Sequence, residues 1–292
     1  MITRLDGKLV SAEIKDQLKL DVIKLKEKNI NPKLAVILVG NDKASQIYVR
    51  NKSKACHELG ILCNEYILPE DIEEDKLLEL IDSLNNDNCI HGILVQMPLP
   101  KHLDSLKIIN SINYMKDVDC LTTTNIGKLH SNNNVIVKSC TPFGIIKLLE
   151  HYKINITGKK AVIIGRSQIV GRPLAELLLQ ESATVIMCHS KTDTYDLKEL
   201  CQNSNIIISA VGKSNFIDSS YIGNNTNIVI DVGITRDENN KVCGDCNYND
   251  ITNKWNDWKT ENYITPVPGG VGPMTVTMLM YNLISLCKEK YL

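Results

Sequence analysis

The 292-residue chain has no long uninterrupted apolar run, and no stretch reaches the roughly 20 residues that a membrane-spanning helix needs. Its first residues lack the apolar segment of a signal peptide. Lysine and arginine (33) balance aspartate and glutamate (34), which leaves a formal net charge of −1. Without a basic excess, nothing indicates binding to nucleic acid or to an anionic membrane surface. We therefore expect a cytoplasmic enzyme.

A second C-x-x-C pair is also absent. Cys243 and Cys246 form the single pair, and no histidine lies near them, which makes a poor zinc site. Most of the ten cysteines lie within apolar segments, as do Cys56, Cys188, Cys201 and Cys287. Buried free thiols behave as small hydrophobic groups. We expect no bound metal and no disulfide framework.

An intact G-x-G-x-x-G fingerprint is missing as well. Residues 161–164 form an apolar run typical of a buried strand, Gly165 follows, and a helical apolar stripe comes next. Strand, glycine turn and helix together are typical of a dinucleotide-binding unit, whose helix N-terminus receives a pyrophosphate. Ser167 and Val170, however, replace the second and third glycines, and Gly171 comes one residue late. This motif alone is equally compatible with an ordinary strand-to-helix turn.

No acidic residue follows the next expected strand, at residues 183–187. A site selective for NAD usually has an Asp or Glu there, which accepts a hydrogen bond from the ribose 2′-OH. Ser190 and Lys191 occupy that place, and Arg166 lies in the glycine turn. Donors and positive charge suit a 2′-phosphate, so the sequence favours NADP, unless Lys191 and Arg166 are only solvated surface charges.

Strands alternate with helices along the chain, which is the pattern of a parallel α/β sheet. In the first half we expect strands at 34–39, 61–68 and 90–96, with an irregular loop at 115–130. In the second half a cofactor-binding unit covers about 155–265, and an apolar helix follows at 274–288.

This order predicts two parallel-sheet α/β domains with a cleft between them, the C-terminal one Rossmann-like. Residues 1–140 form the first domain, which the C-terminal helix at 273–292 completes. Residues 141–272 form the second.

One lysine lies on the apolar side of the helix expected at 45–59. Tyr48, Lys52, Ala55 and Leu59 recur at helical spacing, and the last two mark a packing face. Lys52 is then either a lysine that snorkels past the edge of the core or a partly desolvated ammonium available for proton transfer. Spacing alone favours the first interpretation.

Three further features lie where parallel α/β sheets bind ligands, or at a helix N-terminus. Gln96 ends an apolar strand, either as a cap on the following loop or as a substrate contact. Asp117-Val118-Asp119 begins a loop, where acids are more often turn formers than catalysts. Pro268-Gly269-Gly270 leads into a helix whose first N–H groups suit an anionic or carbonyl-bearing substrate, unless the turn is only rigid.

With these residues, the chain resembles the bifunctional methylenetetrahydrofolate dehydrogenase/cyclohydrolase family over essentially its whole length. Seven segments carry the resemblance, and their common order makes it specific. They are Val39-Gly40 through Ala44-Ser45-x-x-Tyr48-Val49-x-x-Lys52, Gly92-Ile93-Leu94-Val95-Gln96-Met97-Pro98-Leu99-Pro100, Lys116-Asp117-Val118-Asp119, Cys140-Thr141-Pro142-x-Gly144, Gly165-Arg166-Ser167-x-Ile169-Val170-Gly171-x-Pro173, Asp231-Val232-Gly233-Ile234 and Pro266-Val267-Pro268-Gly269-Gly270-Val271-Gly272-Pro273-Met274-Thr275.

The resemblance implies oxidation of 5,10-methylenetetrahydrofolate by NADP, then hydrolysis of the 5,10-methenyl form to 10-formyltetrahydrofolate. It implies a catalytic set of Tyr48, Lys52, Gln96 and Asp119. In this set Lys52 is the catalytic lysine, Gln96 supports it, and Tyr48 lies along the aminobenzoate ring of folate. Asp119 holds the pterin, and Pro268-Gly269-Gly270 flanks the folate.

For the cofactor, the resemblance implies an NADP site lined by Gly165, Arg166, Ser167, Ser190 and Ile234. It also implies a homodimer. One departure concerns the folate loop, because the family usually has Gly-Phe-His where Cys120-Leu121-Thr122 stand here. Asp119 itself is retained, but the effect of this change on pterin binding is open.

Two other functions remain open. Shikimate dehydrogenase has a similar architecture and also pairs a lysine with an acid, but a G-x-G-G turn would favour it and Gly165-Arg166-Ser167 does not match. The chain could also be a non-catalytic nucleotide-binding module with Lys52 as a snorkelling residue. The intact spacing of Tyr48, Lys52, Gln96 and Asp119 argues against that.

Overall fold

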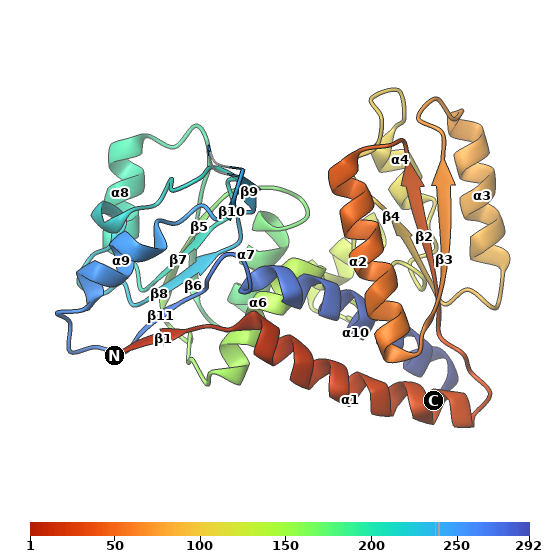
Figure 1. Ribbon diagram of the computed structural model, residues 1–292, viewed down its shortest axis with the longest axis horizontal. Coiled ribbons are helices and arrows are strands. Elements are labelled where there is room, and N and C mark those ends of the chain that lie inside the picture. Colours follow the sequence, from red (N-terminus) through yellow and green to blue (C-terminus); the bar gives the residue numbers. More distant parts are fainter. Residues whose placement is uncertain (237, 239) are drawn as a thin grey trace. The chain divides into compact units, whose positions relative to one another are not determined.

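The computed structural model describes residues 1–236, 238 and 240–292. It confirms the predicted α/β class, with parallel sheets in two compact units (Figure 1). Unit 1 comprises Met1–Ala12 and Thr141–Thr275, and unit 2 comprises Glu13–Cys140 and Val276–Leu292. The expected first domain, residues 1–140, differs from unit 2 at the N-terminus, because residues 1–12 lie in unit 1.

Unit 1 contains six parallel strands in the order β1-β11-β8-β7-β5-β6. Their bounds are Ile2–Arg4 (β1), Lys160–Ile164 (β5), Thr184–Cys188 (β6), Ile206–Ser209 (β7), Ile228–Asp231 (β8) and Asn262–Ile264 (β11). From β5 the chain passes to β6 on one side and then to β7 on the other. Doubly wound sheets bind ligands at such a reversal, outside the strand carboxyl ends.

The remaining elements of unit 1 are short helices and one small hairpin. The helices are α6 (Cys140–His151, in unit 1 from Thr141 onward), α7 (Gly171–Gln180), α8 (Thr194–Gln202) and α9 (Tyr248–Trp255), with a 3-10 turn at Ser219–Tyr221. Strands β9 (Thr235–Arg236) and β10 (Val242–Cys243) pair antiparallel. Buried Val162, Ile207 and Val229 from the central strands pack with Trp255 in the core.

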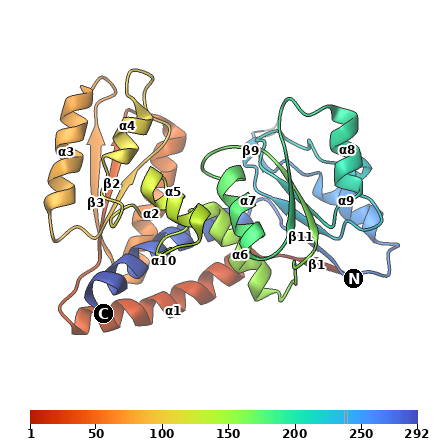
Figure 2. The same ribbon diagram turned by 180° about the vertical axis from the view of Figure 1, so that it is seen from behind.

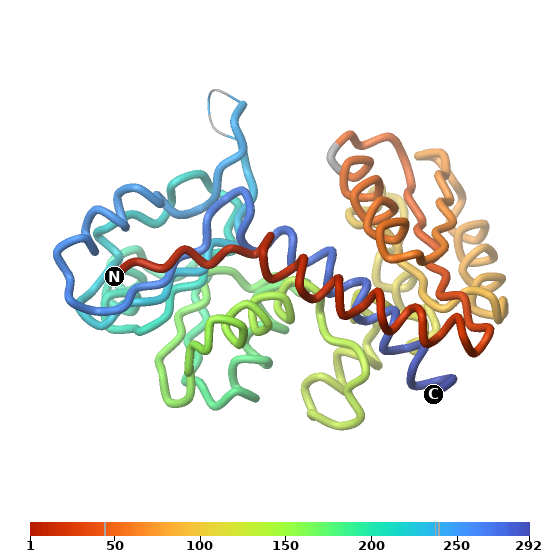
Figure 3. Tube along the Cα trace, turned by 60° about the horizontal axis from the view of Figure 1, so that its bottom comes forward, coloured from red at the N-terminus to blue at the C-terminus, as the bar shows by residue number. Residues whose placement is uncertain are grey.

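Strand β1 is an element that sequence patterning did not reveal. It has three residues, too few to show a period, and it pairs with β11, Ile2 opposite Asn262. Figure 3 traces this N-terminal segment into the long helix α1 (Gly7–Glu27). Because its partner lies at the other end of the sequence, only the folded chain shows that β1 belongs to unit 1.

Unit 2 is built on three parallel strands in the order β3-β2-β4. Their bounds are Lys33–Val39 (β2), Leu62–Leu68 (β3) and Gly92–Val95 (β4), and the helices are α2 (Lys43–Leu59), α3 (Glu74–Asn86), α4 (Ser105–Asn110) and α5 (Thr123–Ser131). Figures 1 and 2 show α2 and α3 flanking this sheet. Central β2 is buried from Leu34 onward, because helices cover both of its faces.

Helix α5 corrects the expected loop at 115–130. Thr122 is its N-cap and accepts a hydrogen bond from the backbone N of Asn125, and Asn132 ends the helix in the left-handed conformation. The helix has only nine residues and two large apolar ones, Ile126 and Leu129. Its apolar period was therefore too short to detect.

The last helix, α10, extends from Val271 to Tyr291, beyond the expected 274–288. Like α1, it begins in unit 1 and continues into unit 2. Within the residues that the structure describes, no helix has both the length and the apolar character needed to cross a membrane.

Candidate active site

A buried hydrogen bond joins Lys52 of α2 to Gln96, the residue after β4. Lys52 Nζ donates to Gln96 Oε1 at 2.9 Å, and each residue is only 9% exposed. Gln96 Nε2 donates to the carbonyl of Met97 at 2.6 Å, which turns Oε1 toward the lysine. Gln96 N also donates to Ile37 O at 2.8 Å, so the residue is fixed at the carboxyl edge between β2 and β4.

Helix α2 positions Lys52 through well-defined ends. Asp42 caps the N-terminus by accepting from Ser45 N at 2.7 Å, and Gly60 ends the helix with φ +70°. Along the predicted stripe, Leu59 and Lys52 are buried and Tyr48 is 44% exposed. Lys52 is thus enclosed and hydrogen-bonded rather than extended past the edge of the core, while Tyr48 remains partly exposed to solvent.

Asp117 orders the loop that carries Asp119. Its carboxylate accepts from Thr122 N at 2.9 Å, Thr122 Oγ1 at 2.8 Å and Asn125 Nδ2 at 2.9 Å. It also accepts from Leu121 N at 3.2 Å. Asp117 is therefore a loop former, whereas Asp119, two residues later, is only half-buried.

The three residues that depart from the family pattern fit within this loop. Cys120 has φ +58°, in the left-handed region that favours glycine, and it is fully buried. Burial raises the pKa of its thiol to about 12. Leu121 packs against the core of unit 2, and Thr122 hydrogen-bonds Asp117 and caps α5. The loop thus keeps a glycine-type backbone shape with a cysteine in place.

Cys140, the first residue of α6, is buried, and the charges of both Asp119 and Lys52 act on its thiol. Burial raises the pKa of the Cys140 thiol well above its usual value; the charge of Asp119 and a hydrogen bond to its carboxylate add to the rise, and nearby Lys52 opposes it. Asn282 Nδ2 donates to Val118 O at 2.8 Å and contacts Cys140 Sγ at 3.5 Å. Sequence reasoning gave Cys140 no role, because its only signal was its place in the Cys-Thr-Pro segment.

In unit 1, the glycine turn after β5 is tightly packed. Gly165 has φ +133°, and a Cβ there would lie 2.6 Å from Ala210 O. A Cβ on Gly171 would lie 2.2 Å from Gly165 O. Ser167 Oγ accepts from Val170 N at 3.2 Å, so it supports the start of α7. The turn therefore requires glycine at both places, although their spacing departs from the usual fingerprint.

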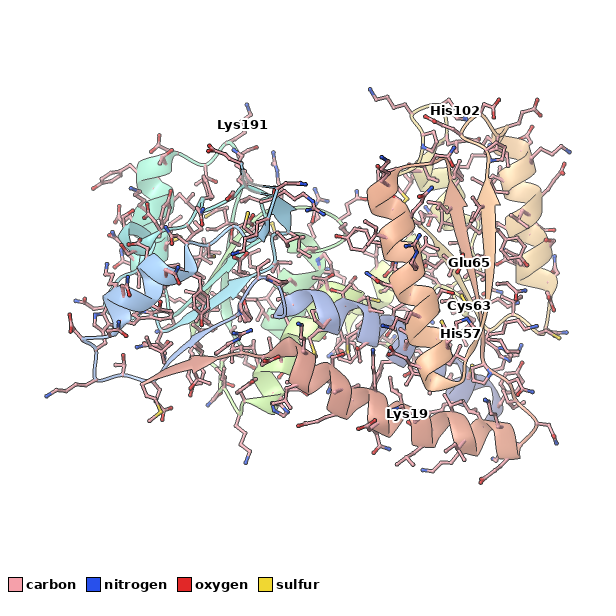
Figure 4. All side chains as sticks on the ribbon, in the orientation of Figure 1. Lys19, His57, Cys63, Glu65, His102 and Lys191 are labelled. Atoms are coloured by element: carbon pink, nitrogen blue, oxygen red, sulfur yellow. The ribbon has the colours of Figure 1, made fainter. Side chains whose placement is uncertain are left out.

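The residues expected around the ribose are exposed. Arg166 and Ser167 lie in the turn, Ser190 and Lys191 follow β6, and Figure 4 shows Lys191 projecting from unit 1. The next acid, Asp193, caps α8 by accepting from Tyr195 N at 2.8 Å. It is therefore engaged as a helix cap.

Two further expected site segments lie in unit 1. Ile234 follows β8 and is 50% exposed. In the Pro268-Gly269-Gly270 turn, Lys8 N of α1 donates to Gly269 O at 3.2 Å. A Cβ on Gly7 would lie 1.8 Å from Gly270 O, so only glycine permits this approach. Pro268 itself is exposed.

Comparison with known proteins shows the family to which the chain belongs. The family model described as tetrahydrofolate dehydrogenase/cyclohydrolase, catalytic domain, matches residues 5–119. The model of the NAD(P)-binding domain of the same family matches residues 139–291. The chain belongs to this family of enzymes. This family is the one that the sequence resembles, and all seven segments that carry the resemblance lie within the two matched ranges.

Family members resemble this chain over its full length. Bifunctional protein FolD of Agathobacter rectalis is 49% identical, with 99% of this chain and 100% of that protein covered. The crystal structure of the bifunctional enzyme FolD from Campylobacter jejuni has a TM-score of 0.94 at 46% identity, covering 99% and 100%. The Trypanosoma brucei enzyme, solved with NADP cofactor and inhibitor, has a TM-score of 0.91 at 35% identity, covering 99% and 98%.

Shikimate dehydrogenase of Aquifex aeolicus also resembles the chain, with a TM-score of 0.52 over 89% of it. The identity is 11%, so the likeness concerns the fold alone. The architectural similarity expected from the sequence is therefore present at the level of the fold.

Proposed function

We propose that this chain oxidises 5,10-methylenetetrahydrofolate with NADP and hydrolyses the 5,10-methenyl product to 10-formyltetrahydrofolate. The observation that carries the proposal is the buried 2.9 Å hydrogen bond between Lys52 and Gln96. It fixes an amine-bearing side chain near the carboxyl end of β4, where such sheets bind ligands. Following the resemblance described above, we assign to that amine the proton transfer of the hydrolysis step.

Hydrolysis depends on moving a proton. Water adds to the methenyl carbon and loses a proton, and a ring nitrogen gains one as its bond to that carbon breaks. A positioned side chain typically accelerates such a step about 10²–10⁴-fold. We assign this proton transfer to Lys52, with Gln96 holding its Nζ. Tyr48, one turn earlier on α2, contacts the aminobenzoate ring.

Oxidation requires alignment more than proton transfer. Two nitrogens flank the methylene carbon, and their lone pairs stabilise the cation that remains when hydride leaves. NADP, when bound, supplies the acceptor for that hydride. The side chains of this protein bind and align both molecules, and such alignment can provide much of the rate.

The residues of unit 1 fit NADP. Gly165 lets the backbone approach a pyrophosphate beside the N-terminus of α7, where N–H groups favour an anion. Arg166, Ser190 and Lys191 offer donors and positive charge for the 2′-phosphate. Ser167 lies in the same turn as Arg166, and Ile234 offers an exposed apolar surface. We accordingly assign cofactor binding to unit 1.

We assign folate binding chiefly to unit 2, where Asp119 stands on the loop ordered by Asp117 and would hold the pterin. Pro268-Gly269-Gly270, at the start of α10 in unit 1, would flank the folate. Because Cys120 preserves the backbone shape of that loop, we expect pterin binding to survive the departure from Gly-Phe-His.

We also propose a homodimer, formed through strand β3. This strand lies at the edge of its sheet, with Leu62 49% and Ile67 63% exposed. Figure 4 shows Cys63 and Glu65 along the same strand. An edge strand offers unpaired N–H and C=O groups, and a second copy related by a two-fold axis can pair with it.

The decisive experiment offers the purified chain NADP with either methylenetetrahydrofolate or shikimate. We expect NADPH to form with the folate only, followed by 10-formyltetrahydrofolate. NADPH formation with shikimate would support the dehydrogenase of that other class. Binding of NADP without turnover of either substrate would support a non-catalytic module.

A further inference from the structure

Two aspartates are buried side by side at the carboxyl edge of the sheet in unit 1. Asp231 ends β8 and is 3% exposed, and Asp245 is fully buried. Backbone N–H groups donate to both carboxylates, and a serine hydroxyl also donates to Asp245. Burying a carboxylate costs free energy unless its oxygens accept hydrogen bonds, so two neighbouring buried carboxylates indicate a specific structural role.

Asp245 holds the loop that follows β7. Its carboxylate accepts from Ser209 Oγ at 3.0 Å, from Val211 N at 2.7 Å and from Lys213 N at 2.8 Å. These donors span the end of the strand and the first turn of the loop. One side chain therefore fixes the path of residues 209–213.

Asp231 holds the segment that carries Asp245. It accepts from Asp245 N at 2.9 Å, from Cys246 N at 2.8 Å and from Gly233 N at 3.2 Å. The third donor lies one residue before Ile234. The two carboxylates and their donors thus form one continuous hydrogen-bond network, which links the loop after β8 to the loop after β7. We call this network the relay.

Two glycines make room for this relay. A Cβ on Gly233 would lie 2.0 Å from Asp245 Oδ1, and a Cβ on Gly244 would lie 2.0 Å from Asp231 Oδ2. Any side chain at either place would displace a carboxylate. The network is therefore close-packed, with little freedom for its loops to shift.

The relay lies beside the turn assigned to the pyrophosphate. Ala210, within the loop held by Asp245, donates its N–H to Ile164 O at 2.9 Å. Its carbonyl lies where a Cβ on Gly165 would come within 2.6 Å. The loops after β5, β7 and β8 meet here, at the reversal of strand order.

We propose that Asp231 and Asp245 are positioning residues for the NADP site, which hold the loops after β7 and β8 against the Gly165 turn. This inference rests on the proposed function. An asparagine cannot replace either carboxylate, because its NH₂ group would face an N–H or O–H donor. Neither aspartate has to touch the cofactor.

The test compares Asp245→Asn with a matched control, Asp250→Asn. Asp250 lies in the same unit and accepts from Ser219 N at 2.7 Å, outside the relay. Fluorescence titration with NADPH gives the Kd without turnover. We expect Asp245→Asn to raise this Kd roughly tenfold and to raise the KM for NADP more than it lowers kcat. The control should stay within about twofold.

Hydrolysis of methenyltetrahydrofolate, assayed without NADP, is the internal reference, because it depends on Lys52 in unit 2. It should be unchanged in Asp245→Asn. An unchanged Kd, or a parallel loss of binding and hydrolysis, would overturn the inference. If Asp245→Asn does not fold, the test uses Ser209→Ala, which removes a single hydrogen-bond donor to Asp245. We expect this variant to raise the Kd for NADPH about threefold. An unchanged Kd would contradict the inference.

The wild-type protein separates this inference from the function on which it rests. A chain that binds NADPH but does not oxidise methylenetetrahydrofolate overturns the proposed function only, and the variants still decide the role of the aspartates. A chain that does not bind NADPH overturns both.

Discussion

Among single residues, Lys52 distinguishes the two reactions by what each requires. Its Nζ is enclosed and bound to Gln96, which suits a group that handles a proton rather than one that attracts substrate from solvent. Hydride transfer has no comparable need for it. The two steps should therefore respond differently when the amine is removed.

We predict that Lys52→Met abolishes hydrolysis of the methenyl bridge and leaves measurable NADP-dependent oxidation. Methionine keeps the bulk of the side chain but cannot transfer a proton, so loss of about 10²–10⁴-fold is expected in that step only. The methenyl intermediate should accumulate. Separate spectrophotometric assays of both steps on the folded variant provide the measurement.

The matched control is Lys54→Met, on the same helix but with its side chain 75% exposed. It should leave both activities near the wild-type level. Equal loss of both in Lys52→Met would instead make Lys52 a substrate-binding residue. Retention of both would remove it from the mechanism.

Cofactor choice is also decided by single residues. Ser190, Lys191 and Arg166 stand where an acid would repel a 2′-phosphate, so kcat/KM should be higher with NADP than with NAD. We predict that Lys191→Glu lowers kcat/KM with NADP about tenfold and has little effect with NAD. Steady-state kinetics with both nucleotides test this.

The control for cofactor choice is Lys160→Glu, an exposed lysine at the amino end of β5. It makes the same lysine-to-glutamate charge change at the opposite end of β5 from the Gly165 turn. An equal loss with both nucleotides in Lys191→Glu, or wild-type kinetics that favour NAD, would show that these side chains do not recognise the 2′-phosphate.

Residue patterns predicted some contacts and missed others for a physical reason. Lys52 could be placed on a packing face and Gln96 at a strand end, because helical and strand periods are local. The left-handed backbone of Cys120 could not be predicted, since cysteine rarely adopts it. The relay of Asp231 and Asp245 joins segments whose contact depends on the complete sheet.

At the level of elements, long periodic segments were predicted and short ones were not. Strands β2 and β5 are continuous apolar runs, so their burial on both faces could be inferred. Strand β1 and helix α5 depend on a distant partner and on capping, respectively. Neither leaves a period in the sequence.

Asp231, at the end of β8, makes the free energy of unfolding depend on pH. Burial raises the pKa of Asp231 from 3.8 to about 6, the charge of Asp245 adds to the rise, and N–H donors from Cys246 and Asp245 oppose it. Because the folded-state pKa lies above the unfolded value, this contribution is full below pH 3.8 and disappears as pH rises through 6.

We predict that the stability advantage of the wild type over Asp231→Asn shrinks by about 1 kcal/mol between pH 5 and pH 7.5. The asparagine does not titrate, so its hydrogen-bond defect is constant over this range. Urea denaturation of both proteins at each pH measures the difference. A difference independent of pH, or one that grows as pH rises, contradicts the assignment.

For the whole molecule, the proposed dimer can be tested at strand β3. We predict that Ile67→Glu produces monomers, because a charge on a paired edge strand is desolvated and repelled by its two-fold copy. Light scattering after size-exclusion chromatography measures the mass. Leu106→Glu, on α4 and also 63% exposed, is the control and should remain dimeric. A wild-type monomer would exclude the dimer.

The pairing of β1 with β11 has a consequence for how the chain is made. Residues 2–4 leave the ribosome long before their partners at 262–264. At about 5–20 residues per second, the N-terminal strand waits roughly 13 seconds or longer for its neighbour. Unit 2 also waits, because Val276–Leu292 belong to it. Neither unit can therefore complete its folding until its own last segment, which ends at Thr275 in unit 1 and at Leu292 in unit 2, has been translated.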